Sequence, residues 1–339
     1  MKRIDIICFS DAGAALAKRL RGSLAASAVS VHAMLPLAQQ NGFEAHESLG
    51  NFMETVFPKT DALIFIGAAG IAVRAIAPFV CSKTTDPAVV VMDDHARFAV
   101  SLLSGHIGGA NALTEELAAL TGAQAVITTA TDVAGKFSCD SWATTHGCAI
   151  SSMPLAKKVS AAILKENIPV AAEFPLPETL PNGLSAGENG KCGIYIGVHT
   201  KEPFPETLRL IPRIVTLGIG CRRGTPPEAI REAITSTLCA WKIDPRAICG
   251  IASIDVKKDE SGLLAAAEQL QAPVRFYSAE ELLAVPGIFE DSAFVREQVG
   301  VGNVCERAAV CGGETLIIPK TAANGVTVAA AMKKWSIVF

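Results

Sequence analysis

Short apolar runs alternate with helical segments at both ends of this 339-residue chain, and this alternation constrains the fold more than any other feature. Near the N-terminus, residues 3–9 and 61–67 (DALIFIG) each look like a strand that is followed by a turn and a helix. Near the C-terminus, the runs at 214–217 and 248–254 show the same pattern. Alternation of this kind favours α/β sheets that are mostly parallel, because parallel neighbours need a crossover connection.

The middle of the chain gives a weaker pattern. Pro and Gly are frequent between residues 174 and 212, and apolar periodicity is poor there. Such segments are typical of irregular or loosely organised structure. We therefore expect an α/β fold made of two α/β domains with mostly parallel sheets, residues 1–132 and 213–339, flanking a smaller middle domain and linker at 133–212.

Helix-capping signals place several boundaries within these domains. Ser10 is expected to cap the first helix, and Gly122 to close the helix that begins after the loop SGHIGGAN. Capping boxes are predicted at residues 225–228 (TPPE) and 278–281 (SAEE). These four signals fix where local structure should begin or end.

Composition excludes several classes of protein. Half of the residues are apolar, 19% are charged and the net charge is −3, so the basic patch of a nucleic-acid-binding protein is missing. No run reaches the roughly 18 apolar residues that span a bilayer, and the start MKRIDIICFSD reads as a strand rather than a signal peptide. The expected protein binds neither nucleic acid nor membrane and works in the cytoplasm.

The ten cysteines do not form a metal-binding or disulfide pattern. None is spaced C-x-x-C, and none clusters in sequence with the six histidines. In a chain this apolar we interpret them as small buried side chains, and we expect no metal site.

Three glycine-rich turns are expected to follow strands: GAAGIAVR at 67–74, SGHIGGAN at 104–111, and GIGCRRG at 218–224, after the strand 214–217. At the carboxyl ends of parallel strands, such turns point backbone N–H groups at a ligand and favour negative charge. Together they predict an anion-binding face. None of them matches a complete dinucleotide or phosphate-loop motif, which disfavours a nucleotide-binding transferase.

His106, between the glycines of SGHIGGAN, is the leading catalytic candidate. An imidazole there could act as a general base near neutral pH, or it could only hydrogen-bond the backbone of its own loop. Ser104 is a candidate hydroxyl donor rather than a nucleophile, since no G-x-S-x-G elbow surrounds it. Glu260, near the end of the strand 248–254, is the third catalytic candidate.

Candidate binding residues lie in the same turns and at strand ends. Arg74, Lys83 and Asp86 could clamp a ligand, although a surface ion pair would explain them equally well. The predicted binding set is Arg74, Lys83, Asp86, Gly105, Gly108, Gly109, Asn111, Cys221, Arg222, Arg223, Lys257 and Lys320.

Several long motifs resemble the CbiG family, the cobalt-precorrin-5A hydrolases of anaerobic cobalamin synthesis. In the N-terminal half these are DALIFIGAAGIAVRAIAP, KTTDPAVVV and LLSGHIGGAN followed by VITTATD. In the C-terminal half they are LGIGCRRG, SIDVKKDE, SAFV, VCERAAV and GVTVAAAM. The family usually has a glycine in the turn before the LLSGH strand, where this chain reads DDHARF.

The resemblance implies a reaction and a set of roles. The substrate would be a cobalt tetrapyrrole, whose ring-A acetate δ-lactone is hydrolysed and whose two-carbon fragment leaves as acetaldehyde. His106 would then be the base, the N–H groups of Gly105 to Gly109 would stabilise the oxyanion, and the cationic side chains would clamp substrate carboxylates. No cofactor beyond the substrate's cobalt is implied, and other enzymes of the pathway are further candidate partners. The alternative is a corrinoid carrier without catalytic activity.

Overall fold

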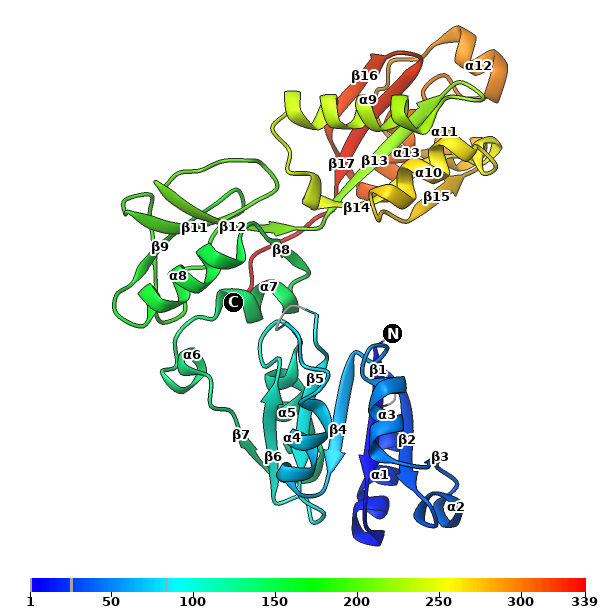
Figure 1. Cartoon of the computed structure of the whole chain (residues 1–339). Coiled ribbons are helices and arrows are strands. Elements are labelled where there is room, and N and C mark those ends of the chain that lie inside the picture. Colours follow the sequence, from blue (N-terminus) through cyan, green and yellow to red (C-terminus); the bar gives the residue numbers. More distant parts are fainter. Residues whose placement is uncertain (1, 25–26, 83–84) are drawn as a thin grey trace. The chain divides into compact units, whose positions relative to one another are not determined.

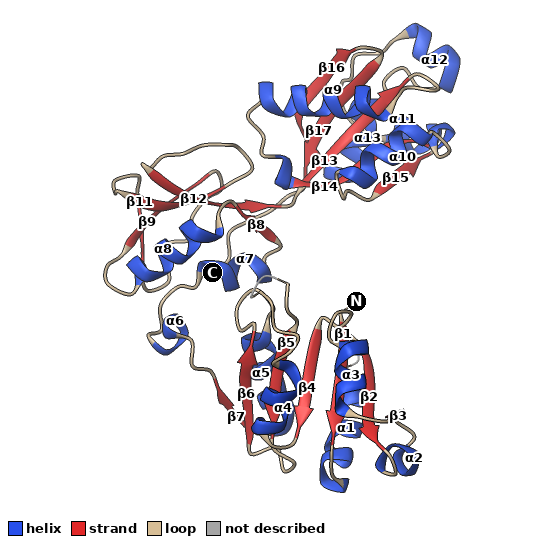
Figure 2. Cartoon of the chain, in the orientation of Figure 1, coloured by secondary structure: helices blue, strands red, loops and turns tan. Residues whose placement is uncertain are grey.

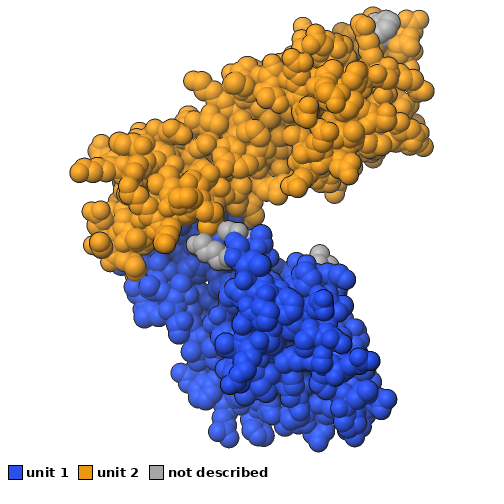
Figure 3. All heavy atoms as spheres, in the orientation of Figure 1, with its two compact units in different colours: residues 1–144 blue, residues 145–339 orange. Residues whose placement is uncertain are grey.

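The computed structural model describes residues 2–24, 27–82 and 85–339, without the side chain of Phe294. The chain divides into two compact units, residues 1–144 and 145–339 (Figure 3). Their helices and strands are labelled in Figure 1 and coloured by type in Figure 2. A mixed α/β fold with three mostly parallel sheets confirms the predicted fold class.

The first unit is built on one seven-stranded sheet. Its strands are β1 (Arg3–Cys8), β2 (Ala28–Met34), β3 (Glu44–His46), β4 (Ala62–Ile66), β5 (Ala88–Met92), β6 (Phe98–Leu103) and β7 (Gln124–Val126). Its helices are α1 (Asp11–Ser23), α2 (Leu37–Asn41), α3 (Leu49–Val56), α4 (Ala69–Ile76), α5 (Ala110–Thr121), α6 (Ala130–Val133) and α7 (Cys139–Thr145).

Helices cover both faces of this sheet. The strand order is β3-β2-β1-β4-β5-β6-β7, so the chain first extends to one side of β1 and then to the other. On one face, α1 and α5 bury Leu20 and Leu117 against the strands, and on the other α3 and α4 bury Phe52 and Ile76. Successive strand residues point to opposite faces, which is why β4 and β5 are apolar throughout.

Strand β6 is the exception to the parallel arrangement, and it corrects one expectation. It pairs antiparallel with β5, because Asp93 accepts hydrogen bonds from the N–H groups of His95, Arg97 and Phe98 and so folds the chain into a tight turn. Ala96 takes the left-handed conformation there, with φ 54°, where a glycine would be unstrained. The carboxyl end of β6, with the loop SGHIGGAN, therefore lies at the opposite end of the strands from Gly67, which follows β4. These two turns do not form one anion-binding face.

The second unit begins with a five-stranded sheet in the order β10-β9-β11-β12-β8. Its elements are β8 (Cys148–Ile150), α8 (Met153–Ile163), β9 (Ile168–Ala172), β10 (Leu184–Ala186), β11 (Cys192–Ile196) and β12 (Glu206–Pro212). Only β8 is antiparallel to its neighbour. The poorly patterned stretch 174–212 thus contains three strands, β10, β11 and β12.

A second five-stranded sheet follows, in the order β15-β14-β13-β17-β16. Its strands are β13 (Val215–Cys221), β14 (Ile248–Ile254), β15 (Val274–Tyr277), β16 (Thr315–Ala323) and β17 (Val326–Met332). The helices are α9 (Pro227–Ala240), α10 (Ser261–Gln269), α11 (Ala279–Ala284), α12 (Ala293–Val299) and α13 (Val304–Gly313), with single 3-10 turns at Pro245–Ala247 and Asp255–Lys257. Helices α9 and α10 pack on one face of the sheet, and α13 packs on the other.

Strand β13 is longer than its sequence suggested. It continues through Cys221, so Gly218 and Gly220 are strand residues and the turn begins only at Arg222. A Cβ atom added at Gly218 would lie 1.8 Å from the carbonyl oxygen of Cys305 in α13. The glycine is required because the helix backbone packs directly against the strand.

The capping signals are confirmed with one exception. Ser10 accepts the N–H of Gly13, Gly122 ends α5 in the left-handed conformation, and Ser278 forms a reciprocal capping box with Glu281. The box predicted at 225–228 is wrong: α9 is capped by Pro226 without a side-chain bond, because the Thr225 hydroxyl donates to the carbonyl of Arg222 instead.

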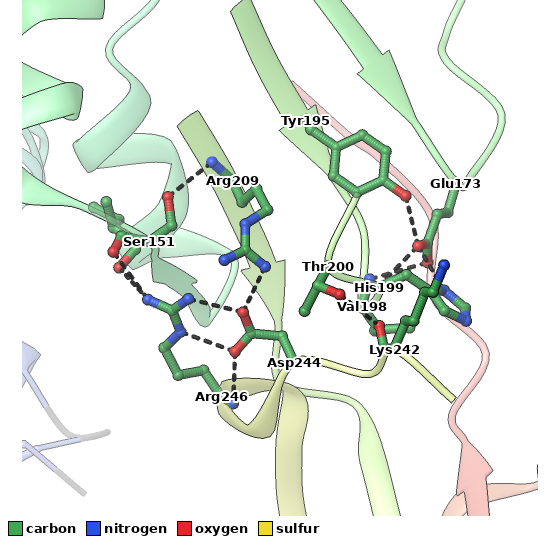
Figure 4. Close-up of polar contacts among 11 residues, drawn as sticks. Ser151, Glu173, Tyr195, Val198, His199, Thr200, Arg209, Lys242, Asp244 and Arg246 are labelled. Carbon is green, nitrogen blue, oxygen red and sulfur yellow. Dashed lines mark hydrogen bonds and ion pairs between the residues drawn. The ribbon is translucent and has the colours of Figure 1, made fainter. Parts of the chain in front are cut away.

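A polar network joins the two sheets of the second unit (Figure 4). Arg209 of β12 and Arg246 both donate to the buried carboxylate of Asp244, with N–O distances of 2.7 Å. These contacts lower the pKa of Asp244 although burial opposes the shift. Beside them, Glu173 accepts hydrogen bonds from Tyr195 and His199. The two sheets also share an apolar core.

Three expectations about organisation have different outcomes. The division at residues 132 and 212 stays a prediction. All ten cysteines are free thiols, but Cys81 and Cys239 are exposed, so the interpretation of every cysteine as a buried side chain is wrong for these two. Within residues 2–24, 27–82 and 85–339, no helix is both long and apolar enough to cross a membrane.

Candidate active site and ligand pocket

The loop between β6 and α5 carries His106, and its geometry depends on small residues. Ser104 has a positive φ of 56°, and a Cβ atom at Gly108 would lie 2.4 Å from its Cβ. Gly109, with φ 87°, turns the chain into the first residue of α5. Hydrogen bonds from the N–H groups of Ala110 and Asn111 to the carbonyls of Ser104 and Gly105 close the loop. These contacts hold His106 in a defined place.

His106 lies between two carboxylates. Its Nε2 is 2.8 Å from Oδ2 of Asp132 in α6, and its Nδ1 is 3.0 Å from Oδ1 of Asp140 in α7. Ser138 donates to the same Asp140 oxygen at 2.9 Å. Asn111 of α5 donates to Oδ2 of Asp132 at 3.1 Å and receives a hydrogen bond from Ser101. We call His106, Asp132 and Asp140 the Asp–His–Asp cluster.

The charges of this cluster follow from its contacts. Burial lowers the pKa of His106, but hydrogen bonds to Asp140 and Asp132 outweigh that effect and raise it overall. Burial raises the pKa of Asp140, but the His106 contact and other hydrogen bonds bring it down to about 2. The two carboxylates therefore favour the protonated, cationic form of the histidine.

Hydrogen-bonding groups remain unused around the cluster. The side-chain hydroxyls of Ser104 and Thr131 are buried and have no partner among the described residues. Within the described parts of the chain, the N–H groups of Gly105, His106, Ile107 and Gly108 also find no acceptor. Buried polar groups are normally paired, so these donors are suited to a ligand oxygen.

A second group of predicted residues lines a pocket of about 650 Å³ in the second unit. The pocket lies at the carboxyl ends of β13 and β14, the edge at which α/β sheets bind ligands. No described residue that lines it is acidic. The pocket brings together five residues of the predicted binding set: Cys221, Arg222, Arg223, Lys257 and Lys320. Four cations around one cavity favour an anionic ligand.

Glu260 does not line this pocket, but it contacts Lys257, which does. Its carboxylate accepts the N–H of Gly224 at 2.8 Å and lies 3.4 Å from Nζ of Lys257, and the residue is 7% exposed. Its contacts are therefore those of a group that anchors the turn after β13. Burial raises the pKa of Cys221, and this effect outweighs that of Lys257, which lowers it. This pocket residue is therefore a neutral thiol.

The remaining predicted residues lie elsewhere. Arg74 lies in the last turn of α4, and its one acceptor among the described residues is the carbonyl of Gly70 in its own helix. Asp86 uses its carboxylate to accept the N–H groups of Cys81 and Ser82, which holds its own loop. Lys83 lies outside the described residues. The roles of all the predicted site residues stay predictions.

Sequence reasoning missed Asp132, Asp140 and Ser138. Asp132 was placed only as the end of the motif VITTATD, and nothing in the sequence indicates a contact between His106 and Asp140, which are 34 positions apart. The available signal was two aspartates that follow the last strand of the unit, in a stretch rich in Ser and Thr.

An imidazole held between two carboxylates, beside free backbone donors, is an arrangement that acid–base enzymes use. Residues 51–132 match the family model described as cobalamin synthesis G N-terminal, and residues 215–331 match the one described as cobalamin synthesis G C-terminus. The chain therefore belongs to the CbiG family of cobalamin synthesis proteins.

Two relatives that are more than 30% identical support this assignment over most of the chain, and they show that the chain is a hydrolase. A Salmonella typhimurium protein named cobalt-precorrin-5A hydrolase is 37% identical over 335 residues, covering 90% of each chain. A Priestia megaterium protein of the same name is 32% identical over 307 residues, covering 84% of this chain and 82% of the relative. The crystal structure of a cobalamin biosynthesis protein G homolog from Sulfolobus solfataricus is 24% identical, covers 98% of this chain and 97% of that one, and has a TM-score of 0.43.

Proposed function

We propose that this chain is a cobalt-precorrin-5A hydrolase. It opens the ring-A acetate δ-lactone of the cobalt tetrapyrrole and releases the two-carbon fragment as acetaldehyde, giving cobalt-precorrin-5B in anaerobic cobalamin synthesis. The observation that carries this proposal is the 37% identity, over 90% of both chains, to a protein of that name. We also propose that it acts in the cytoplasm, alongside other enzymes of the pathway, and needs no cofactor of its own.

The chemistry suits the residues around His106. Water adds to the lactone carbonyl, and the tetrahedral intermediate expels the alkoxide when its C–O bond breaks. The N–H groups of the glycine-rich loop are suited to the oxyanion of that intermediate. The alkoxide then forms the C=O bond of acetaldehyde, its C–C bond to the ring breaks, and the electron pair enters the conjugated macrocycle. Much of the driving force for the last step belongs to the substrate.

The test is anaerobic incubation of the purified chain with the cobalt lactone, without added metal or nucleotide, followed by trapping of acetaldehyde. We expect one acetaldehyde for each lactone consumed. A protein that binds the lactone and leaves it intact would instead be a carrier, and the hydrolase proposal would then be wrong for this chain.

The pocket of the second unit is proposed to bind substrate carboxylates, and Lys320 tests this. Its side chain lines the pocket and has no hydrogen-bond partner in the described structure, whereas Lys257 is tied to Glu260. Lys320→Ala is expected to weaken binding by about 1–3 kcal/mol, typical of a charge-assisted hydrogen bond. Titration of the substrate by absorbance measures the affinity. Lys334→Ala, which removes an exposed cation outside the pocket, is the matched control and should bind normally.

A further inference from the structure

His106 was expected to take a proton, but its contacts argue against that role. Each ring nitrogen faces a carboxylate oxygen, at 2.8 Å and 3.0 Å. An ionised carboxylate only accepts hydrogen bonds, so each nitrogen must carry a hydrogen to make its contact. A ring with hydrogens on both nitrogens has no lone pair for a proton from water. In this arrangement His106 is a donor on both sides and not a base.

The two carboxylates differ in what they have left to offer. The side chain of Asp140 is 13% exposed. Its Oδ1 accepts three hydrogen bonds, from His106, from Ser138 and from the N–H of Ser141. Asp132 is 34% exposed. Its Oδ2 accepts from His106 and Asn111, while Oδ1 has no partner among the described residues and is not buried. One oxygen of Asp132 is therefore anchored and the other is open.

The surroundings of Asp132 are suited to a water molecule and an ester. The adjacent Thr131 is 5% exposed, and its hydroxyl is one of the two buried hydroxyls without a described partner. The other belongs to Ser104, two residues before His106 in the glycine-rich loop. A base-catalysed attack on a carbonyl needs both an open base and hydrogen-bond donors, and the segments that carry Asp132 and His106 supply one unused donor each.

From this geometry, and on the basis of the proposed function, we propose that Asp132 is the general base of the hydrolysis and that His106 and Asp140 are positioning residues. Oδ1 of Asp132 takes a proton from water as the oxygen of that water bonds to the lactone carbonyl carbon. The lactone C–O bond breaks, and the proton on Asp132 is later released to solvent. His106 stays a cation throughout, fixing Oδ2, and Asp140 holds the far side of the imidazole.

The test compares Asp132→Asn with Asp132→Glu in single-turnover rate and substrate affinity. Asp132→Asn keeps the shape of the side chain but cannot accept the proton, so turnover should fall by roughly 10²–10⁴-fold with affinity nearly unchanged. Asp132→Glu retains a carboxylate and should keep part of the activity. Glu116→Gln, which neutralises an exposed carboxylate of α5, is the matched control and should turn over normally.

Nitrogen NMR of His106 gives a second readout that does not need the substrate. The wild-type ring should show the shifts of an imidazolium at neutral pH. In Asp140→Asn, the pKa of His106 should fall, and turnover should then decline as pH rises through that lower value. This pH profile would separate a positioning residue from one that only stabilises the fold.

Two results would overturn the assignment of Asp132. One is normal turnover by Asp132→Asn in a wild-type background that releases acetaldehyde, which leaves the proposed function intact. The other is a neutral His106 ring at pH 7 in the wild-type protein. A wild-type protein that releases no acetaldehyde from the lactone would sink the proposed function itself, and the base assignment with it.

Discussion

His106→Ala is expected to lower single-turnover hydrolysis at least about 100-fold, with substrate affinity almost unchanged. The imidazole holds Asp132 through Nε2 and is itself held by Asp140 through Nδ1. Removing it leaves Asn111 as the remaining described partner of Oδ2 of Asp132, and leaves two carboxylates facing each other without the cation between them. Loss of the productive geometry of a reacting group typically costs about this much. Rapid-quench measurement of acetaldehyde and absorbance titration of the substrate give the two quantities separately.

A double variant shows whether the cluster acts as a unit. His106→Ala combined with Asp140→Asn should be no slower than His106→Ala alone, because Asp140 acts only through the imidazole. If the two losses multiply instead, Asp140 contributes independently of His106. Circular dichroism of each variant checks that the first unit remains folded.

The fold class could be predicted because apolar periodicity reports directly on burial. The run ALIFI within DALIFIG is apolar throughout because β4 is covered on both faces, by α1 and α5 on one side and by α3 and α4 on the other. What periodicity does not contain is strand direction. The turn at Asp93 makes β6 antiparallel to β5, so SGHIGGAN lies at the end of the strands opposite to Gly67.

The candidate site was only half predictable for a related reason. Arg222 and Arg223 follow β13 and Lys257 follows β14, and these two strands are neighbours in the sheet, so strand ends alone were enough to bring the three residues together. Cys221 is the last residue of β13, and Lys320 lies within β16, two strands away from β13 in the sheet. The partners of His106 come instead from α6 and α7, short helices beyond the last strand of the first unit. Their approach depends on tertiary packing that no local pattern encodes. The charge state of His106 could not be predicted without those partners.

Gly218 shows how one residue can be placed correctly in sequence and still be misinterpreted. The motif GIGCRRG was expected to be a ligand-binding turn, yet its first glycines lie within β13. Gly218 is needed because the backbone of α13 packs directly against β13 at this position. Helix α13 begins at the pocket, with Asn303 as its N-cap. The motif therefore positions the wall of the pocket, and its residues from Gly220 to Arg223 line it.

Gly218→Ala is expected to destabilise the second unit by at least about 3 kcal/mol, the upper end of what overpacking a core costs. The added Cβ would lie 1.8 Å from the carbonyl oxygen of Cys305 and 2.7 Å from the amide nitrogen of Ala309, and backbone atoms cannot rotate away. Helix α13 would have to lift off the sheet, and the pocket would lose its wall. Hydrogen exchange of peptides from β13 and α13 measures the loss locally, which avoids assuming that both units unfold together.

Gly250→Ala is the matched control in the neighbouring strand β14. Its Cβ would lie 3.3 Å from the carbonyl oxygen of Pro273, a gap that a shift of a few tenths of an ångström can relieve. We expect its effect on exchange to be small, within about 1 kcal/mol, because a slight displacement of the edge strand β15 relieves the contact. If β13 and α13 are equally protected from exchange in the two variants, the packing of α13 on the sheet does not require a glycine at position 218. A large loss in Gly218→Ala alone would establish that the glycine is there for helix packing and not for ligand contact.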